Sequence, residues 1–141
     1  MLDVNVIMAL LDYKHVFHTR AHDWWAINIK SGWASCPLTE NGVVRIMSNP
    51  NYDRPHRFPV SDLIGRLRGF TEETDHEFWA DSISFLDDTL INSELIHGPK
   101  QIADLYLLAL ATEHHGRLVT FDQGISISAV VRAIGNNLCL I

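Results

Sequence analysis

The sequence has few cysteines, few lysines and no long apolar run. Its two cysteines, Cys36 and Cys139, have no C-x-x-C spacing and lie in apolar segments, which is typical of buried thiols rather than of a disulfide or redox pair. The longest apolar run, residues 105–111, is far shorter than the roughly 20 residues of a membrane-spanning helix. Asp3 stands early and no basic segment precedes the first apolar residues, so we expect no secretory signal peptide and a cytoplasmic protein.

The length and composition predict one folded domain. A chain of 141 residues, 47% of them apolar, can bury a core without disulfides or a structural metal. No internal repeat, low-complexity run or linker divides it. We therefore expect a single domain over residues 1–141.

Positive charge is concentrated in one segment, although the formal net charge is -6. Between residues 45 and 68 the chain has five arginines and only two acids. Such a segment can bind the phosphates of a polyanion, and it can equally be an ordinary solvated helix and loop. The candidate phosphate-binding residues are Arg45, Arg54 and Arg57.

Residues 100–125 are the stretch around which the rest of the chain is organised. Residues 101–115 are apolar nearly all round and predict a buried helix, in which Asp104 is out of place. A tight turn at Gly116 then leads to a short interior strand, residues 117–121, which ends at Asp122. The two acids can belong to a site at a sheet edge; alternatively, Asp104 interacts with the helix dipole and Asp122 opens a turn.

Two further acids stand in similar places. Asp3 lies in or at the end of a buried strand: either the strand continues through Asn5, or it stops at Asp3 and a helix begins near Asn5. Residues 33–38 predict a second strand, after which Thr39 is expected to cap a helix over residues 40–48. Glu40 would then open a helix just after a strand, where an ordinary acid is also favoured by the helix dipole.

The remaining pattern is that of a parallel, three-layer α/β domain. Expected elements are a helix ended by Gly32, an irregular loop over 49–59, a helix capped by Ser61 with Leu63, Ile64 and Leu67 inward, a strand at 78–80, short helices at 82–90 and 126–134, and a strand at 138–141. The histidines at positions 15, 18 and 22 have helical spacing. Because residues 19–20 resemble a loop and a helix start, we do not expect a histidine metal site there.

The four acids, Asp3, Glu40, Asp104 and Asp122, predict a metal site if they converge. Clustered carboxylates repel each other unless divalent cations or shifted pKa values compensate. Ligands that are all oxygen favour Mg²⁺ or Mn²⁺, and these ions suit phosphodiester cleavage.

These residues also carry a family resemblance. The segments LDVNV (2–6), CPLTENGVVRI (36–46), ADLYLLALA (103–111) and GRLVTFDQGI (116–125) resemble the PIN-domain ribonucleases, and in particular the VapC toxins of bacterial type II toxin-antitoxin pairs. The resemblance spans nearly the whole chain. It implies a three-layer α/β/α sandwich around a short, mostly parallel sheet of about five strands.

The resemblance also implies roles for individual residues. Asp3, Asp104 and Asp122 would surround the metal, Glu40 would complete the site through a bound water or by orienting the nucleophile, and Asn5 would hydrogen-bond near Asp3. The implied activity is Mg²⁺- or Mn²⁺-dependent endonucleolytic cleavage of structured RNA, commonly tRNA or ribosomal RNA. The implied assembly is a homodimer with a small antitoxin whose C-terminal segment blocks the cleft. Ala103 departs from the threonine of many relatives and removes no ligand.

Two other functions are weighed against this one. A receiver-type phosphoacceptor would need an acid next to Asp3 and a lysine after a late strand, but the lysines are Lys14, Lys30 and Lys100. An inactive PIN-like module that only binds RNA or protein stays open, although the intact set of four acids counts against it.

Overall fold

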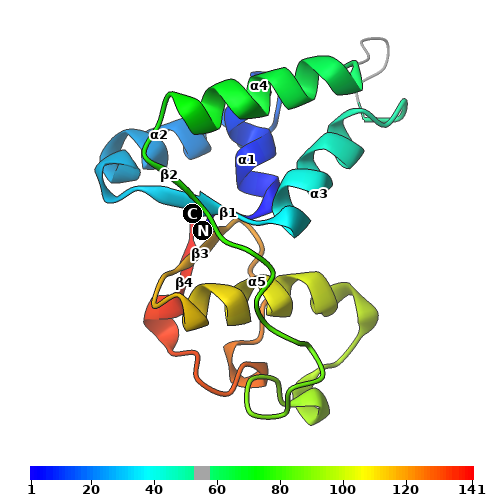
Figure 1. Cartoon of the computed structure of the whole chain (residues 1–141), viewed down its shortest axis with the longest axis vertical. Coiled ribbons are helices and arrows are strands. Elements are labelled where there is room, and N and C mark those ends of the chain that lie inside the picture. Colours follow the sequence, from blue (N-terminus) through cyan, green and yellow to red (C-terminus); the bar gives the residue numbers. More distant parts are fainter. Residues whose placement is uncertain (53–57) are drawn as a thin grey trace. The chain divides into compact units, whose positions relative to one another are not determined.

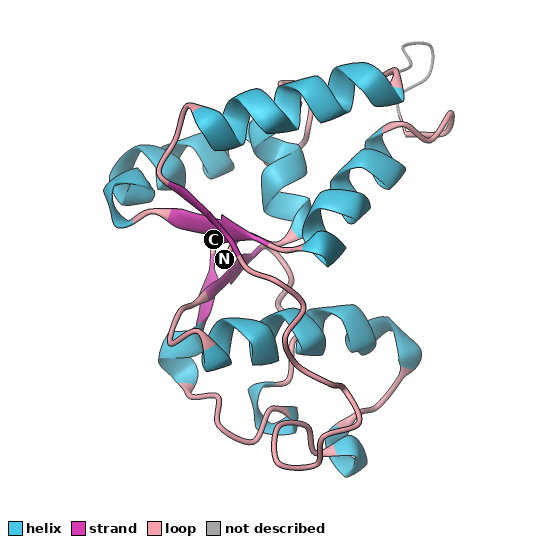
Figure 2. Ribbon diagram, in the orientation of Figure 1, coloured by secondary structure: helices cyan, strands magenta, loops and turns pink. Residues whose placement is uncertain are grey.

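The computed structural model describes residues 1–52 and 58–141. Helices and short parallel strands alternate along the chain, so the expected α/β class is confirmed (Figures 1 and 2). The described residues form two compact units: an N-terminal unit, Leu2–Ala80, and a C-terminal unit, Asp81–Ile141 together with Met1. None of the helices in the described ranges is long and apolar enough to cross a membrane.

The N-terminal unit begins with a single bridge residue and then a helix. Leu2 N donates to Ala34 O at 3.0 Å, and α1 (Val4–Leu11) starts two residues later. Of the two starts that the sequence left open, the helical one is confirmed and the strand through Asn5 is wrong. Asp3 is the N-cap, and its carboxylate accepts a hydrogen bond from the first backbone N–H of the helix.

Helix α2 (His18–Asn28) and a short 3₁₀ turn (Ile29–Ser31) end at Gly32, as expected. Gly32 has φ 68°, in the left-handed region that favours glycine at the end of a helix. The helix begins at His18, before the residues 19–20 at which the sequence predicted its start. Strand β1 (Trp33–Ser35) follows and pairs in parallel with β2 (His76–Phe78), which starts two residues before the predicted strand at 78–80.

Helix α3 (Pro37–Met47) starts three residues earlier than predicted. Pro37 occupies the first turn, where its missing N–H costs nothing, and this stops the preceding strand at Ser35. Thr39 is therefore not the N-cap. Its Oγ1 accepts from Cys36 N at 2.9 Å and donates to Cys36 O at 3.0 Å. Thr39 therefore stabilises the first turn of α3 through hydrogen bonds to the backbone of Cys36.

Helix α4 (Val60–Glu72) starts at Val60, so Ser61 lies inside its first turn and is not the predicted cap. Leu63 and Leu67 are buried as expected, but Ile64 is 43% exposed. Helix α3 packs against α1 and α4, and α1 also packs against α2 (Figure 1).

The C-terminal unit is built around α5 (Ile102–Glu113), β3 (Leu118–Thr120) and β4 (Leu138–Leu140), so the predicted central helix and the strands on either side of residues 121–137 are confirmed. The strands pair in parallel with Val119 opposite Cys139, and Val119 N donates to Met1 O at 3.0 Å. The turn after α5 depends on His115, which has φ 54°, rather than on Gly116. Gly116 N closes that turn on Ala111 O at 2.8 Å.

Two predicted helices of this unit are wrong or shorter. Residues 82–90 form turns, in which Asp87 Oδ1 accepts from Thr89 N at 2.9 Å and from Thr89 Oγ1 at 2.7 Å. Side chains of this kind compete with helical hydrogen bonds, and this overrides the weak apolar pattern. Of the predicted helix at 126–134, only the 3₁₀ turn Ile127–Ala129 forms.

Candidate active site

Asp3 is held rigidly at the start of α1. Its side chain is buried, with 5% of the residue exposed. Asp3 Oδ1 accepts from Val4 N at 2.6 Å, and Oδ2 accepts from Asn5 Nδ2 at 2.8 Å. Both oxygens therefore have defined orientations.

Glu40 lies in the first turn of α3, and its orientation depends on two residues that the sequence reading missed. Ser35 Oγ donates to Glu40 Oε1 at 2.6 Å, and His76 Nε2 lies 2.8 Å from the same Oγ. Ser35, at the end of a strand and five residues before an acid, could have been suspected from sequence. His76 could not, because its place depends on the pairing of β1 with β2 across 41 residues.

The environment of His76 combines an aromatic face with acidic neighbours. The ring packs on Trp33, with centroids 4.4 Å apart. Burial lowers the pKa of His76 below its ordinary value, and the negative charges of Glu40 and Glu77 partly oppose this shift. The neutral imidazole is therefore favoured in the folded protein.

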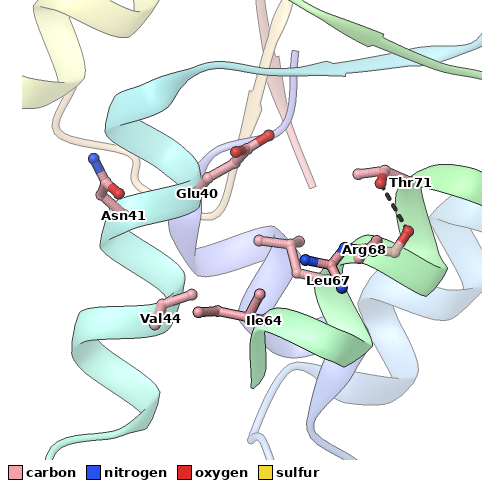
Figure 3. Close-up of a pocket in the computed structure, with 7 residues that line it drawn as sticks. All are labelled: Glu40, Asn41, Val44, Ile64, Leu67, Arg68 and Thr71. Carbon is pink, nitrogen blue, oxygen red and sulfur yellow. Dashed lines mark hydrogen bonds between the residues drawn. The ribbon is translucent and has the colours of Figure 1, made fainter. Parts of the chain in front are cut away.

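A surface groove of about 360 Å³ runs between α3 and α4 beside Glu40. Its lining residues are Glu40, Asn41, Val44, Ile64, Leu67, Arg68 and Thr71. Figure 3 shows Glu40 projecting from α3 and Arg68 from α4, with the apolar side chains between the two helices. The groove thus combines an apolar floor with one acid and one guanidinium, which suits a ligand that carries both apolar and negatively charged groups.

The predicted arginines are only partly placed. Arg45 is exposed on α3 and does not line the groove. Arg54 and Arg57 lie outside the described residues. Among the described arginines, Arg68 lines the groove together with Glu40; it belongs to the predicted basic segment but was not singled out as a phosphate-binding residue.

Asp104 and Asp122 belong to the C-terminal unit. Asp104 is half-buried in the first turn of α5, where a negative charge is favoured by the helix dipole. Asp122 is exposed and forms a turn: its Oδ1 accepts from Gly124 N at 2.6 Å, and its own N donates to Thr120 Oγ1 at 3.0 Å. An acid in a first helical turn and an acid that forms a turn can both have a purely structural role, which is the alternative that the sequence left open for Asp104 and Asp122.

The histidines near the N-terminus form a different feature. His18 Nδ1 lies 2.8 Å from Ala9 O, and His22 Nε2 lies 3.1 Å from Leu10 O. A carbonyl oxygen only accepts, so each of these nitrogens carries a proton and cannot ligate a metal. The pair satisfies carbonyls in the last turn of α1 and thereby joins α2 to it.

The candidate acids of each unit offer only oxygen atoms as ligands. Asp3 and Glu40 supply carboxylates in the N-terminal unit, and Asp104 and Asp122 supply them in the C-terminal unit. Such a set fits Mg²⁺ or Mn²⁺ better than a softer metal. Within neither unit do the described residues include three or more His, Cys, Asp or Glu side chains grouped to hold a metal.

Fold and site together define the class: an α/β protein whose acids stand beside strand ends and helix starts. The chain belongs to the PIN domain family, which it matches over residues 1–130. That range contains Asp3, Glu40, Asp104 and Asp122.

Within the family, the chain is of the VapC type. It is 48% identical over 138 residues to Ribonuclease VapC44 of Mycobacterium tuberculosis. The matched region covers 98% of this chain and 96% of the relative. Ribonuclease VapC38 of the same organism is 40% identical over 125 residues, covering 89% and 86% of the two chains. Ribonuclease VapC39, also from this organism, is 36% identical over 129 residues, covering 92% of each.

Proposed function

We propose that this protein is a divalent-metal-dependent endoribonuclease, a toxin that cleaves structured RNA such as tRNA or ribosomal RNA. The supporting observation is the family match over a range that contains all four acids, together with full-length relatives that are named ribonucleases. In this proposal residues 1–141 are a single PIN domain, and its catalytic acids are Asp3, Glu40, Asp104 and Asp122.

Asp3, Asp104 and Asp122 are the residues that would hold Mg²⁺ or Mn²⁺. A divalent cation, when bound, supplies the activation of water and the neutralisation of phosphate charge. Asn5 and the backbone N–H of Val4 orient the Asp3 carboxylate for that task.

Glu40 orients the attacking water and takes a proton from it. Ser35 occupies Oε1, and within the described residues no hydrogen bond engages Oε2. Oε2 is therefore the atom available to the water. The water oxygen bonds to phosphorus as the phosphorus–oxygen bond to the leaving nucleoside breaks, and the leaving oxygen is protonated from solvent.

RNA contacts are proposed for Arg45, Arg54 and Arg57, and the groove adds Arg68. Guanidinium groups suit phosphates because their fork of N–H donors matches two phosphate oxygens. We further propose a cytoplasmic homodimer whose cognate antitoxin inhibits it by covering the acidic site with its C-terminal segment.

The test is RNA cleavage by the purified chain, freed of any bound partner, in Mn²⁺, in Mg²⁺ and in EDTA. Asp104→Asn removes the charge at nearly constant shape, and Asp62→Asn is the matched control because Asp62 also lies in a first helical turn and is exposed. We expect discrete fragments that require metal, persist in the control and vanish in Asp104→Asn.

A second outcome would favour the alternative function. RNA that is bound but never cut, with any metal, would indicate a catalytically inactive PIN-like module that binds RNA or protein. Full cleavage by Asp104→Asn would refute the assigned role of that acid.

A further inference from the structure

Ser35, Glu40 and His76 form a continuous hydrogen-bonded chain in the N-terminal unit. The distances are 2.6 Å from Ser35 Oγ to Glu40 Oε1 and 2.8 Å from His76 Nε2 to Ser35 Oγ. Ser35 and His76 are not among the four acids of the proposed site. Neither residue serves only to fill the core, because Ser35 Oγ and His76 Nε2 are within hydrogen-bonding distance of each other.

The direction of the chain follows from the number of protons. An ionised carboxylate only accepts, so the single proton of Ser35 Oγ is donated to Glu40. The oxygen of Ser35 is then an acceptor toward His76, and His76 Nε2 must carry a proton. Nε2 carries that proton in both the neutral and the charged imidazole, so the chain persists in either state.

The fold holds the two supporting residues in place. Ser35 is fully buried, and side chains alternate along a strand, so Trp33 and Ser35 share one face of β1. His76 is paired with Trp33 in the parallel register and packs on its ring. Trp33 itself is fixed by Phe70, 4.8 Å between centroids, and by a 2.8 Å hydrogen bond from Nε1 to Thr74 Oγ1.

We propose that Ser35 and His76 are positioning residues for Glu40: they occupy Oε1 and thereby set the direction in which Oε2 meets the attacking water. This inference rests on the proposed nuclease function and on the role of Glu40 in it. A carboxylate on a flexible side chain samples several rotamers, and a buried donor selects one of them. Loss of the chain should therefore reduce the rate of the chemical step more than the affinity for RNA.

The variants are Ser35→Ala, His76→Phe, His76→Gln and the double variant Ser35→Ala/His76→Phe. Phenylalanine keeps the ring against Trp33 but removes the donor, whereas the amide nitrogen of glutamine replaces Nε2–H. We expect kcat to fall about 10- to 100-fold in Ser35→Ala and His76→Phe, with KM nearly unchanged and most of the rate restored in His76→Gln. The double variant should be no slower than Ser35→Ala, because both residues act through one chain.

His15→Phe is the matched control, since His15 is also half-buried in the N-terminal unit and is not part of the hydrogen-bonded chain of Ser35, Glu40 and His76. Thermal melts followed by circular dichroism establish which variants fold. Should Ser35→Ala not fold, the contrast between His76→Phe and His76→Gln still decides the question. Unchanged kcat in His76→Phe, or an equal loss in His76→Gln, would overturn the inference.

A second readout does not depend on activity. In protein with ¹⁵N-labelled histidine, the ring nitrogens of His76 should show the Nε2–H tautomer above its pKa, and Ser35→Ala should change the Nε2–H resonance. A proton on Nδ1 instead of Nε2 would show that the proposed hydrogen bond from His76 to Ser35 is absent. If the wild type cleaves RNA and both Ser35→Ala and His76→Phe keep its kcat, the inference about Ser35 and His76 is wrong and the proposed function stands. If the wild type never cleaves RNA, the proposed function itself is wrong.

Discussion

A Cβ atom on Gly42 would lie 2.7 Å from Cγ2 of Val4, closer than two such carbons approach. Gly42 therefore allows α3 to pack tightly on the first residue of α1. Asp3 directly precedes Val4, and Glu40 stands two residues before Gly42. The same contact thus joins the start of α1, next to Asp3, to the part of α3 that follows Glu40.

Gly42→Ala should destabilise the protein by about 1–3 kcal/mol, because the added methyl group has no room against Val4. Gly65→Ala is the matched control: nothing lies within 4 Å of its added methyl, and alanine should stabilise α4 by about 0.4–1 kcal/mol. Urea unfolding measures both. Equal effects of the two substitutions would show that the close contact between α1 and α3 is absent in solution.

Asp3→Asn should abolish cleavage and leave the fold nearly as stable as before. Asparagine caps helices about as well as aspartate, so only a few tenths of a kcal/mol should be lost, whereas Asp3→Ala should cost about 1 kcal/mol. Urea unfolding and metal-dependent RNA cleavage are measured on the same preparations. Retained activity in Asp3→Asn would remove this carboxylate from the proposed metal ligands.

Arg68→Ala should weaken RNA binding and flatten its dependence on salt. Each lost phosphate contact lowers the slope of log K against log salt by about 0.7 for a single strand. Arg66→Ala is the control on the same helix, because its guanidinium lies over the ring of Phe58, 5.4 Å from its centroid, and does not line the groove. The measurement is RNA-binding affinity, titrated at several salt concentrations. Equal salt slopes for wild type and Arg68→Ala would exclude a phosphate contact by Arg68.

Arg54→Ala and Arg57→Ala make a separate prediction for the basic segment. If this segment contacts RNA, each substitution should lower affinity and the salt slope in the same way. The same titrations measure it. Unchanged slopes would identify these two residues as an ordinary solvated part of the chain.

Stability should fall as the pH is lowered through the range in which histidines titrate. Burial lowers the pKa of His76 and of His15, so the unfolded chain binds protons at a pH where the folded chain does not. This destabilisation begins near the ordinary histidine pKa of about 6.5 and levels off below the lowered values. Urea midpoints between pH 5 and 8 should show a weaker dependence in His76→Gln than in wild type. An identical dependence would mean that His76 has an ordinary pKa in the folded protein.

Local patterns in the sequence were sufficient for much of the fold. The helix from Ile102 and the strand from Leu118 could be predicted because an apolar run and β-branched residues act over a few neighbouring positions. The boundaries were less predictable. Pro37 began α3 three residues before Glu40, where the helix was expected to start, and Asp87 formed turns where a helix was expected, since single side chains decide such points.

The sequence by itself determined the family, the α/β class and the four candidate acids, because each depends on residues close together in the chain or on their order. Tertiary structure alone decided what surrounds Glu40. The pairing of β1 with β2 brings His76 to Ser35, and the packing of α4 on α3 places Arg68 in the same groove as Glu40. No local pattern encodes these neighbours, because parallel strands pair across a long connection and the pairing depends on packing of the whole unit.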